Sequence, residues 1–423
     1  MSAVRLHVMI QTMKKVLLVT TVSGFVPQFE LNNVRILQSL GYEVHYASNF
    51  HMPSYGDDND RLKGTGIVCH QIDFVRSPFS PQNRKVYRQL KALMQTQSFS
   101  LVHCHTPMGG VMARLCAHVT HTGPVIYTAH GFHFFAGAPL WNWLSYYPME
   151  RFLSRYTTEQ ICINQEDYAR AKRSFHARFV DYIPGVGFDP ASVPDCAKAQ
   201  RMKKRETLGF GEHQCILLSV GELIKRKNHE TVIRALAALK EEGKSLPLQY
   251  VICGHGRLDA KLRQLAKQLG VEQLVRFLGY RKDILEICQA ADLFVFPSYQ
   301  EGLPMALLEA MACGLPVICS AIRGSRDLME ENSSDQAERL PPEKFSSEKR
   351  SAKKAKLLPC RGGVMIRKAD DVSAYGEAIA GALALWQNHP ERLSAFGEAN
   401  RNRSRQFSLE QVGAKMQEIY SRF

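Results

Sequence analysis

Two glutamates stand eight residues apart in the segment FPSYQEGLPMALLEAMACGLPVICS, residues 296–320. Glu301 lies in a turn after a strand-like apolar run, and Glu309 follows two helical turns later within an apolar helical pattern. A carboxylate on an apolar helix face is costly unless it accepts hydrogen bonds. The hydroxyl groups of a nucleotide's ribose are suitable donors. The alternative is a structural carboxylate that caps a neighbouring loop.

The residues between these glutamates lead into the helix. Gly302 and Leu303 form the turn, and Pro304 suits the first helical position, because a proline lacks only an N–H that would have no partner there. A glycine-containing turn that precedes a helix presents free backbone N–H groups and the positive end of the helix dipole. The pattern therefore predicts an anion-binding device at the carboxyl end of a strand.

A second candidate is the basic loop GELIKRKN, residues 221–228, which follows another strand-like run. Lys225, Arg226 and Lys227 stand side by side in this loop. Lysine or arginine can neutralise the charge that grows on a departing diphosphate without help from a metal. The alternative is an ordinary solvated charged surface.

Histidines and a glycine mark the candidate site in the first half of the chain. His130 ends a strand-like run, whereas His103 and His105 alternate with Cys104 and should share one face of a strand. A zinc site would need more ligands at suitable spacing, so we interpret these two histidines as structural and expect no metal. Gly24 follows the first strand-like run, and it either lets phosphates or the acceptor approach closely or simply forms a turn.

The candidate residues lie at the ends of short apolar runs that alternate with helical patterns. Runs that are apolar on both faces are typical of strands covered by helices on both sides of a parallel sheet, and ligands of such sheets bind at the carboxyl ends of the strands. The expected strands are Lys15–Thr21, Glu43–Ser48, Ile67–Asp73, Leu101–His105, Val125–His130, Ile161–Asn164, Cys215–Gly221, Gln249–Gly254, Leu293–Ser298 and Pro316–Ala321.

This pattern restarts after the turn-rich segment PGVGFDP, residues 184–190. The sequence therefore predicts an α/β protein with two doubly wound, Rossmann-like domains that face a cleft, over residues 1–186 and 187–390. Residues 331–361 are charged and poor in apolar side chains, which predicts a disordered insertion. The helices expected over 391–423 either pack on the second domain or cross back to the first.

The spacing of Glu301 and Glu309 in EGLPMALLE resembles the E-x7-E motif of retaining glycosyltransferases with the GT-B fold, in the group called family 4. The segments SVGELIKRKNHE, VICGHGRLDAKL, FLGYRKDI and ADLFVFPS fit the same pattern. In the N-terminal half, GFVPQFELNNVRIL, HCHTPMGG and YTAHGFHFF resemble the subgroup that makes bacterial capsular and exopolysaccharides. The resemblance covers the chain except for residues 331–361.

The resemblance implies a role for each carboxylate and for one histidine. Glu301 would face the donor sugar, Glu309 would bind the ribose, and the backbone around Gly302–Pro304 would approach the sugar and the diphosphate. His130 would help to position the sugar or its phosphate.

The resemblance also implies how the diphosphate leaves. Lys227 would stabilise it during front-side displacement through an oxocarbenium-like transition state, with no cofactor and no metal. The family often has a basic residue directly after the glycine, but Glu222 stands there in this chain. Either Lys225 or Arg226 would then supply the second positive charge.

Composition limits the classes of partner. The chain has 423 residues and a formal net charge of +14, so we expect an anionic partner. The excess of basic residues is evenly spread along the chain, however, and no nucleic-acid reader motif accompanies it. No complete dinucleotide fingerprint, P-loop or hydrolase elbow occurs. The chain has eleven cysteines without zinc-finger spacing, and we find no signal peptide and no membrane span in the sequence. These features predict a cytoplasmic protein.

Two segments suggest a membrane-facing side. NRKVYRQLKALMQ, residues 83–95, is a basic amphipathic helix, and LWNWLSYYPMERFLSRY, residues 140–156, is rich in tryptophan and tyrosine. Ordinary core-facing helices are the alternative for both. A lipid-linked acceptor, which the resemblance implies, would favour peripheral attachment to the inner face of the cell membrane.

Together these features predict a retaining glycosyltransferase of bacterial exopolysaccharide or capsule biosynthesis. The expected donor is a nucleotide sugar, with UDP as its nucleotide, and the expected acceptor is a glycan or a polyprenyl-diphosphate-linked sugar. The alternatives are a nucleotide-sugar epimerase or phosphorylase of the same fold, a basic nucleic-acid-binding protein and a membrane scaffold.

Overall fold

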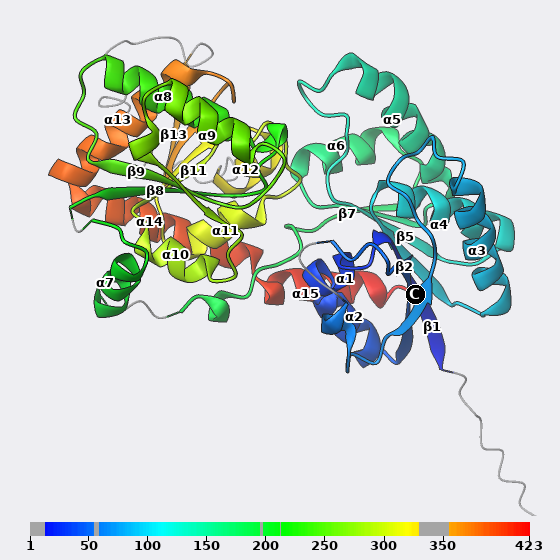
Figure 1. Cartoon of the computed structure of the whole chain (residues 1–423). Coiled ribbons are helices and arrows are strands. Elements are labelled where there is room, and N and C mark those ends of the chain that lie inside the picture. The colour runs from blue at the N-terminus through cyan, green and yellow to red at the C-terminus, as the bar shows by residue number, and fades with distance from the viewer. Residues whose placement is uncertain (1–12, 55–58, 195–197, 212, 330–354) are drawn as a thin grey trace, which may run out of the picture. The chain divides into compact units, whose positions relative to one another are not determined.

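A computed structural model describes residues 13–54, 59–194, 198–211, 213–329 and 355–423. The chain divides into two compact units. The first comprises the residues up to Val186 together with Glu410–Phe423, and the second comprises Gly187–Leu409. Each unit is an α/β structure built around one sheet (Figure 1).

The sheet of the first unit has seven parallel strands among the described residues, in the order β3-β2-β1-β4-β5-β6-β7. This is the Rossmann order extended by one edge strand. The strands are β1 (Lys14–Val22), β2 (Tyr42–Asn49), β3 (Val68–Gln71), β4 (Leu101–His105), β5 (Val125–Ala129), β6 (Glu159–Cys162) and β7 (Phe179–Tyr182).

Helices connect these strands and bury the central ones. Leu17 and Val19 on one face of β1 pack in one core cluster with Met112 and Ala113 of the helix after β4, and Val16 and Leu18 on the other face are buried as well. The helices are α1 (Phe25–Phe29), α2 (Leu31–Ser39), α3 (Asn83–Thr96), α4 (Pro107–Thr120), α5 (Leu140–Leu153), α6 (Gln165–Ser174) and, from the C-terminus, α15 (Leu409–Tyr420).

The sheet of the second unit repeats the arrangement in the order β10-β9-β8-β11-β12-β14-β13. All neighbours are parallel except the edge strand β13, which is antiparallel to β14. The strands are β8 (Cys215–Val220), β9 (Leu248–Cys253), β10 (Val275–Gly279), β11 (Leu293–Phe296), β12 (Val317–Ser320), β13 (Leu357–Cys360) and β14 (Gly363–Ile366).

Helices cover both faces of this second sheet. In Figure 1, α8, α9 and α13 lie on one face, and α10, α11 and α14 lie on the other. The helices are α7 (Lys198–Thr207), α8 (His229–Glu241), α9 (Asp259–Gln268), α10 (Ile284–Ala290), α11 (Met305–Ala312), α12 (Arg323–Met329), α13 (Val372–Asn388) and α14 (Pro390–Ser404).

All ten expected strands overlap a strand of the structure, and the expected α/β class with two Rossmann-like units is confirmed. Strands β7, β10, β13 and β14 were not expected from the sequence. Three of these lie at the edges of the sheets, where residues are partly exposed and the apolar run is broken. Pro359 stands in edge strand β13, a position that tolerates proline because one side of the strand needs no ladder hydrogen bond.

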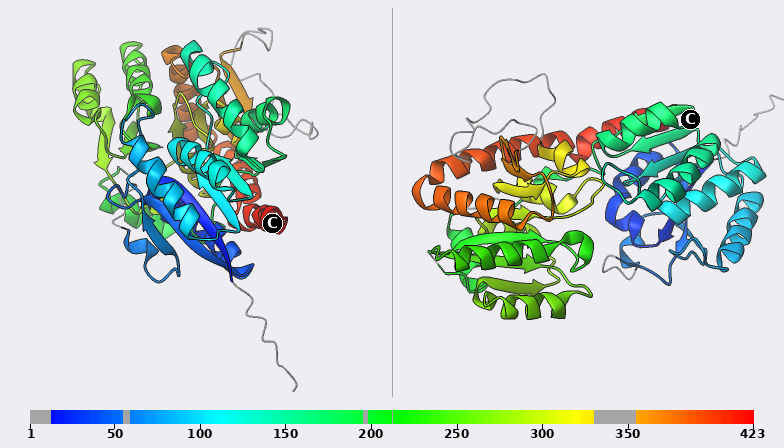
Figure 2. Two further views of the ribbon diagram at one scale, coloured as in Figure 1. Left: turned by 90° about the vertical axis from the view of Figure 1, so that its right-hand side faces the viewer. Right: turned by 90° about the horizontal axis from the view of Figure 1, so that it is seen from above.

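Two boundaries of the sequence analysis are corrected. The expected insertion over 331–361 falls outside the described residues up to 354, but its last part forms β13, so its C-terminal boundary is wrong. The helices over 391–423 do not act as one group. Helix α14 belongs to the second unit, whereas Glu410–Phe423 belongs to the first. In the right-hand view of Figure 2, the C-terminus lies beside elements of the first unit.

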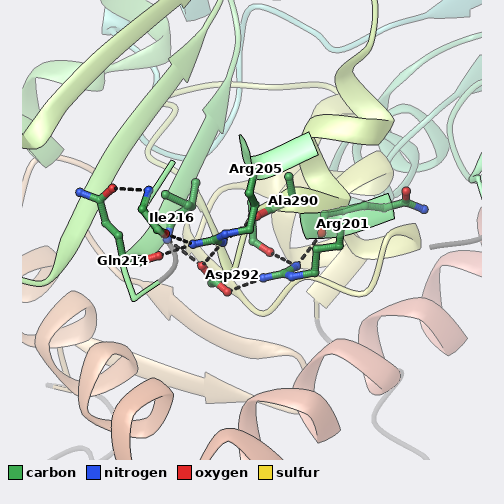
Figure 3. Close-up of polar contacts among 9 residues, drawn as sticks. Arg201, Arg205, Gln214, Ile216, Ala290 and Asp292 are labelled. Atoms are coloured by element: carbon green, nitrogen blue, oxygen red, sulfur yellow. Dashed lines mark hydrogen bonds and ion pairs between the residues drawn. The ribbon is translucent and has the colours of Figure 1, made fainter. Parts of the chain in front are cut away.

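A buried arginine network attaches α7 to the amino ends of the second unit's strands (Figure 3). Arg205 donates to the carbonyl of Ala290 at 2.9 Å and to the Asp292 carboxylate at 3.1 Å, and Arg201 pairs with the same carboxylate at 2.5 Å. The backbone N–H of Ile216 donates to Asp292 Oδ2 at 2.8 Å, the same oxygen that accepts from Arg205. These contacts hold the first helix of the unit, and they lie away from the carboxyl ends of its strands.

Candidate active site

The strand order of the second unit brings two loops together. β8 and β11 are neighbours at the point where the strand order reverses, which is where Rossmann-like sheets bind ligands. The loop of residues 221–228 follows β8, and the loop of residues 297–304 follows β11. The backbone N–H of Tyr299 donates to the Arg226 carbonyl at 2.8 Å, and Asn228 Nδ2 donates to the Pro297 carbonyl at 3.0 Å. The two loops therefore form one rigid structure.

Glu301 is the centre of this structure. Its Oε1 lies 2.8 Å from Lys227 Nζ, and its Oε2 lies 2.8 Å from Arg226 Nη1. Burial raises the pKa of Glu301, but the charges of Lys227 and Arg226 outweigh this effect and lower the pKa below its usual value. The site thus holds a buried, ionised carboxylate between two cations.

Lys227 is held by its packing as well as by its charge. Its side chain is only 14% exposed, and its Nζ lies 5.1 Å from the centre of the Phe296 ring. A Cβ added at Gly221 would meet the Lys227 stem at 3.2 Å, so the glycine after β8 leaves room for this lysine. Lys225, by contrast, is exposed. Its side chain makes no polar contact with the described residues.

The turn into α11 has the expected residues but a shifted boundary. Pro304 is the N-cap with an extended backbone, and the helix begins at Met305, so the expectation that Pro304 occupies the first helical position is wrong by one residue. Arg323 Nε donates to the Glu301 carbonyl at 3.0 Å. Gly324 lies against the Gly302 carbonyl so closely that an added Cβ would stand 2.2 Å from it.

Glu309 lies on α11, about one helical turn beyond Met305. Burial raises its pKa to about 7. Among the described residues nothing donates a hydrogen bond to its carboxylate, so it does not cap a neighbouring loop. The alternative of a structural carboxylate that caps a loop therefore loses its support. The partly buried Glu309 carboxylate remains available as a hydrogen-bond acceptor beside the turn.

His130 and His105 meet in the first unit, at the carboxyl ends of β5 and β4. His105 Nδ1 lies 3.1 Å from His130 Nε2. Glu30, between α1 and α2, has its Oε1 at 3.5 Å from His105 Nδ1 and 3.7 Å from His130 Nε2. Burial raises the pKa of Glu30 to about 8 and lowers that of His130 to about 4. All three groups therefore favour their neutral forms.

His103 lies deeper than this cluster, and its role is structural. Its Nδ1 lies 2.8 Å from the Tyr420 hydroxyl of α15, and its Nε2 lies 2.8 Å from Thr128 Oγ1. Burial lowers the pKa of His103 to about 3. The rings of His103 and His105 lie 4.1 Å apart, so the expectation that they share one face of the strand is confirmed.

Sequence reasoning missed Glu30. The residue lies at the junction of two short helices, with the exposed fraction of its side chain at 2%. A glutamate between Phe29 and Leu31 gives a weak signal, because an acidic residue within an apolar stretch can also point to solvent. Its burial beside two histidines depends on how α1 packs against β4 and β5.

Gly24 is required by the protein's own backbone. Its N–H donates to the Pro53 carbonyl at 2.7 Å, and an added Cβ would stand 2.2 Å from that oxygen. This contact favours the simple turn over an approach to phosphates or to an acceptor, because Pro53 and Ser54 already occupy the space beside the glycine.

The two segments expected to face a membrane differ. In α3, Val86, Leu90 and Met94 are buried in the core of the first unit, so the apolar side of this helix is not available to lipid. In α5, Leu140, Trp141 and Leu144 are exposed by 73%, 69% and 63%. Among the described residues every helix is too short or too polar to serve as a transmembrane span.

A cavity of about 800 Å³ in the second unit lies elsewhere. It is lined by residues that precede β11 and β12, including Asp292 and Pro316, and by Arg401 of α14. None of the residues around Glu301 lines it. We therefore place the candidate site at the carboxyl ends of the strands.

Comparisons with known proteins agree with this fold. Residues 200–358 match the family described as "Glycosyl transferases group 1", and residues 15–165 match the family described as "Glycosyl transferase 4-like". EpsD of Bacillus subtilis (strain 168), which is named as a glycosyltransferase, is 35% identical over 414 residues, or 97% of each chain. The chain belongs to the group 1 glycosyltransferases.

Other relatives of this glycosyltransferase extend the comparison. The Escherichia coli protein named UDP-Gal:alpha-D-GlcNAc-diphosphoundecaprenol alpha-1,3-galactosyltransferase is 28% identical over 282 residues, which are 66% of this chain and 71% of that protein. Anabaena HepE, solved in complex with UDP and glucose, is similar with a TM-score of 0.71 at 17% identity, over 97% of this chain and 100% of that one.

The solved structure of the glycosyltransferase WaaG gives a TM-score of 0.66 at 19% identity, over 96% of this chain and 99% of that one. These likenesses confirm the expected GT-B fold. They say nothing about individual residues of the site, so the roles of Glu301, Glu309, Lys227 and His130 remain predictions.

Proposed function

We propose that this glycosyltransferase moves a sugar from a UDP-linked donor to a glycan or polyprenyl-diphosphate-linked acceptor, with retention at the anomeric carbon. The observation that carries the donor part of the proposal is the contact of Glu301 with Lys227 and Arg226 at the strand-order reversal of the second unit. The names of HepE's complex with UDP and of the E. coli galactosyltransferase support a UDP donor and a lipid-linked acceptor.

The two cations fit the demands of a departing diphosphate. Negative charge grows on the leaving group as the glycosidic bond breaks, and fixed positive charges in a partly buried site stabilise it most in the transition state. Lys227 is preferred as the main contributor, because it is 14% exposed whereas Arg226 is 42% exposed. Transfer then requires no metal, since the side chains of this chain supply the charge.

The two carboxylates, Glu301 and Glu309, are suited to bind the sugar and the ribose of the donor. Before donor binds, Glu301 keeps both cations in place, and the diphosphate then offers them a second partner. Glu301 is thereby available to accept hydrogen bonds from the sugar hydroxyls. Glu309 has no donor among the described residues and stands on the helix that begins at the turn, so it is suited to accept a hydrogen bond from the ribose.

Retention is proposed to arise by front-side displacement through an oxocarbenium-like transition state. His130 would orient the sugar in this scheme, as a neutral imidazole, because burial keeps its pKa near 4. The anomeric configuration of the product, read by NMR from donor of known configuration, tests this step. Inversion would refute the retaining mechanism and leave the donor site unaffected.

The function is tested by transfer assays with purified protein. UDP-glucose, UDP-galactose, UDP-GlcNAc and UDP-GalNAc are each incubated with polyprenyl-diphosphate-linked mono- and disaccharides, and the products are separated by chromatography. Transfer should occur with one donor, and Glu301→Gln should reduce it strongly, whereas exposed Lys225→Ala serves as the matched control. Conversion of a donor without acceptor would instead indicate an epimerase.

The biological setting is proposed from the same relatives. An acceptor held in the inner leaflet requires the enzyme to work at the inner face of the cell membrane, in exopolysaccharide or capsule biosynthesis. The exposed apolar side chains of α5 are the surface that suits such attachment, since tryptophan favours the interface of a bilayer. The basic excess of the chain would add attraction to anionic lipid.

A further inference from the structure

Three side-chain atoms of the first unit converge on one point. His105 Nδ1, His130 Nε2 and Glu30 Oε1 lie 3.1, 3.5 and 3.7 Å from one another. A point equidistant from all three lies about 2.0 Å from each, which matches the usual zinc distances of about 2.0–2.1 Å to histidine nitrogen and about 2.0–2.2 Å to carboxylate oxygen. A hydrogen bond joins only the two histidines, since the distances of 3.5 and 3.7 Å to Glu30 Oε1 exceed the usual hydrogen-bond range.

The surroundings hold these atoms in position. Asn33 Nδ2 donates to Glu30 Oε2 at 2.5 Å, which leaves Oε1 free to bind a cation. The ring of Phe25 packs edge-on against His130, with 4.8 Å between the centres, and the ring of His103 packs at a tilt against that of His105. Supporting contacts of this kind orient the ligands of a metal.

The site is accessible from one side. His105 is fully buried and Glu30 nearly so, but the side chain of His130 is 21% exposed. A cation and a water molecule can therefore enter along His130. Two histidines, one glutamate and an open fourth position form a ligand set that tetrahedral zinc uses in enzymes.

We propose that the first unit binds one Zn²⁺ ion through Glu30, His105 and His130, with the fourth position open to solvent. No metal was expected from the sequence, because His103 and His105 by themselves are too few ligands for a zinc site. The fold supplies these partners from β5 and from the α1–α2 junction, and His103 is not one of the ligands.

One feature limits the affinity. Ligation through Nδ1 places the ring proton of His105 on Nε2, which is buried and finds no acceptor among the described residues. Loss of such an outer hydrogen bond typically costs about 10–100-fold in affinity. We therefore expect reversible binding that a chelator removes while the protein stays folded.

Zinc at this site should inhibit transfer. This consequence rests on the proposed function, in which His130 orients the donor sugar. An ion that takes His130 Nε2 withdraws that nitrogen from the sugar, so the transfer rate should fall as zinc is added.

The binding test uses the full chain, freed of any affinity tag and treated with chelator. Titration with Co²⁺ should give a visible absorption of tetrahedral cobalt without a thiolate charge-transfer band, and one equivalent of Zn²⁺ should remove it. Glu30→Gln, which keeps the shape of the side chain, and His105→Ala should each weaken binding by more than about 100-fold. His118→Ala, a change at an exposed histidine of α4, should leave it unchanged.

The outcomes separate this inference from the proposed function. Wild-type protein that takes up no metal, or Glu30→Gln protein that binds as the wild type does, overturns the zinc site. Circular dichroism shows whether each variant is folded, and Glu30→Gln keeps the test valid if His105→Ala does not fold. Absence of transfer with every donor refutes the function but leaves the cobalt result intact.

Discussion

Replacement of Lys227 by alanine tests the arrangement around Glu301 most directly. If Lys227 stabilises the departing diphosphate, its loss should reduce kcat by about 10²–10³-fold, the effect of removing one preorganised group that stabilises transition-state charge. The Michaelis constant for the donor should change less, because the charge of the leaving group is largest in the transition state.

The same substitution should leave the protein folded. Glu301 keeps its 2.8 Å contact with Arg226, so it is not left buried without a partner. The free energy of unfolding should fall by about 1.5–3 kcal/mol, the contribution of one charged hydrogen bond. Arg226→Ala should cost only about 0–1 kcal/mol, because the Arg226 side chain is 42% exposed.

The double variant supplies the decisive comparison. Without both cations, Glu301 is a buried and unpaired carboxylate, which should cost about 3–5 kcal/mol. Urea unfolding monitored by circular dichroism measures all three variants, and steady-state kinetics measures kcat. A folded Lys227→Ala enzyme with kcat within threefold of wild type would refute the role of the lysine, and normal stability of the double variant would refute the contact itself.

Three further predictions concern other parts of the chain. Burial raises the pKa of Glu309 to about 7, so between pH 4.5 and 7 the folded state binds a proton that the unfolded state has lost. Stability should therefore fall as pH rises through this range. Glu309→Gln should remove this pH dependence of the melting temperature and should weaken UDP binding. The double variant Trp141→Ser, Leu144→Ser should bind anionic vesicles at least tenfold more weakly in flotation assays, since each exposed apolar side chain contributes about 1.5–3 kcal/mol when it is buried. Met202→Ser in the second unit should not change binding. Equal flotation of the double variant and the Met202→Ser protein would exclude α5 as the membrane contact. In the first unit, buried Arg114 of α4 pairs with the Glu150 carboxylate of α5 at 2.8 Å. Arg114→Ala removes the cation from this pair, so the free energy of unfolding measured in urea should fall by about 3–5 kcal/mol. A fall below about 1 kcal/mol would show that the pair contributes little to stability.

Much of the donor site could be predicted because it depends on strand order. Apolar runs such as CILLSV and LFVF identify buried parallel strands, and the loops that follow neighbouring strands must lie close together. The approach of residues 221–228 to residues 297–304 follows from this rule. The sequence could not tell which of Lys225, Arg226 and Lys227 faces Glu301, since that depends on the single short helical turn they form.

The histidine cluster shows what the sequence leaves open. His103 and His105 could be assigned to one face of a strand by their alternation, yet their partners come from Glu30, His130 and Tyr420, which are distant in sequence. A pattern with a period of two or 3.6 residues specifies a face of an element. It does not specify what packs against that face.

The membrane segments illustrate the same limit. Helix α3 is amphipathic in sequence and helix α5 is rich in tryptophan and tyrosine. The structure buries the apolar side of α3 in the core, whereas α5 exposes Leu140, Trp141 and Leu144. Likewise, only the assembled units show that α15 joins the first unit while α14 stays with the second.

The sequence by itself determined the two Rossmann-like sheets, the strand ends that carry Glu301, Lys227 and His130, and the resemblance to glycosyltransferases. These features are local or follow from strand order, so they can be read from periodicity and turns. Only the tertiary structure decided that Lys227 and Arg226 share Glu301, that Glu309 has no partner in the described chain, and that Glu30 meets two histidines. Each of these depends on burial and on contacts between distant residues, which set the charge and the pKa of a group and which no local pattern contains.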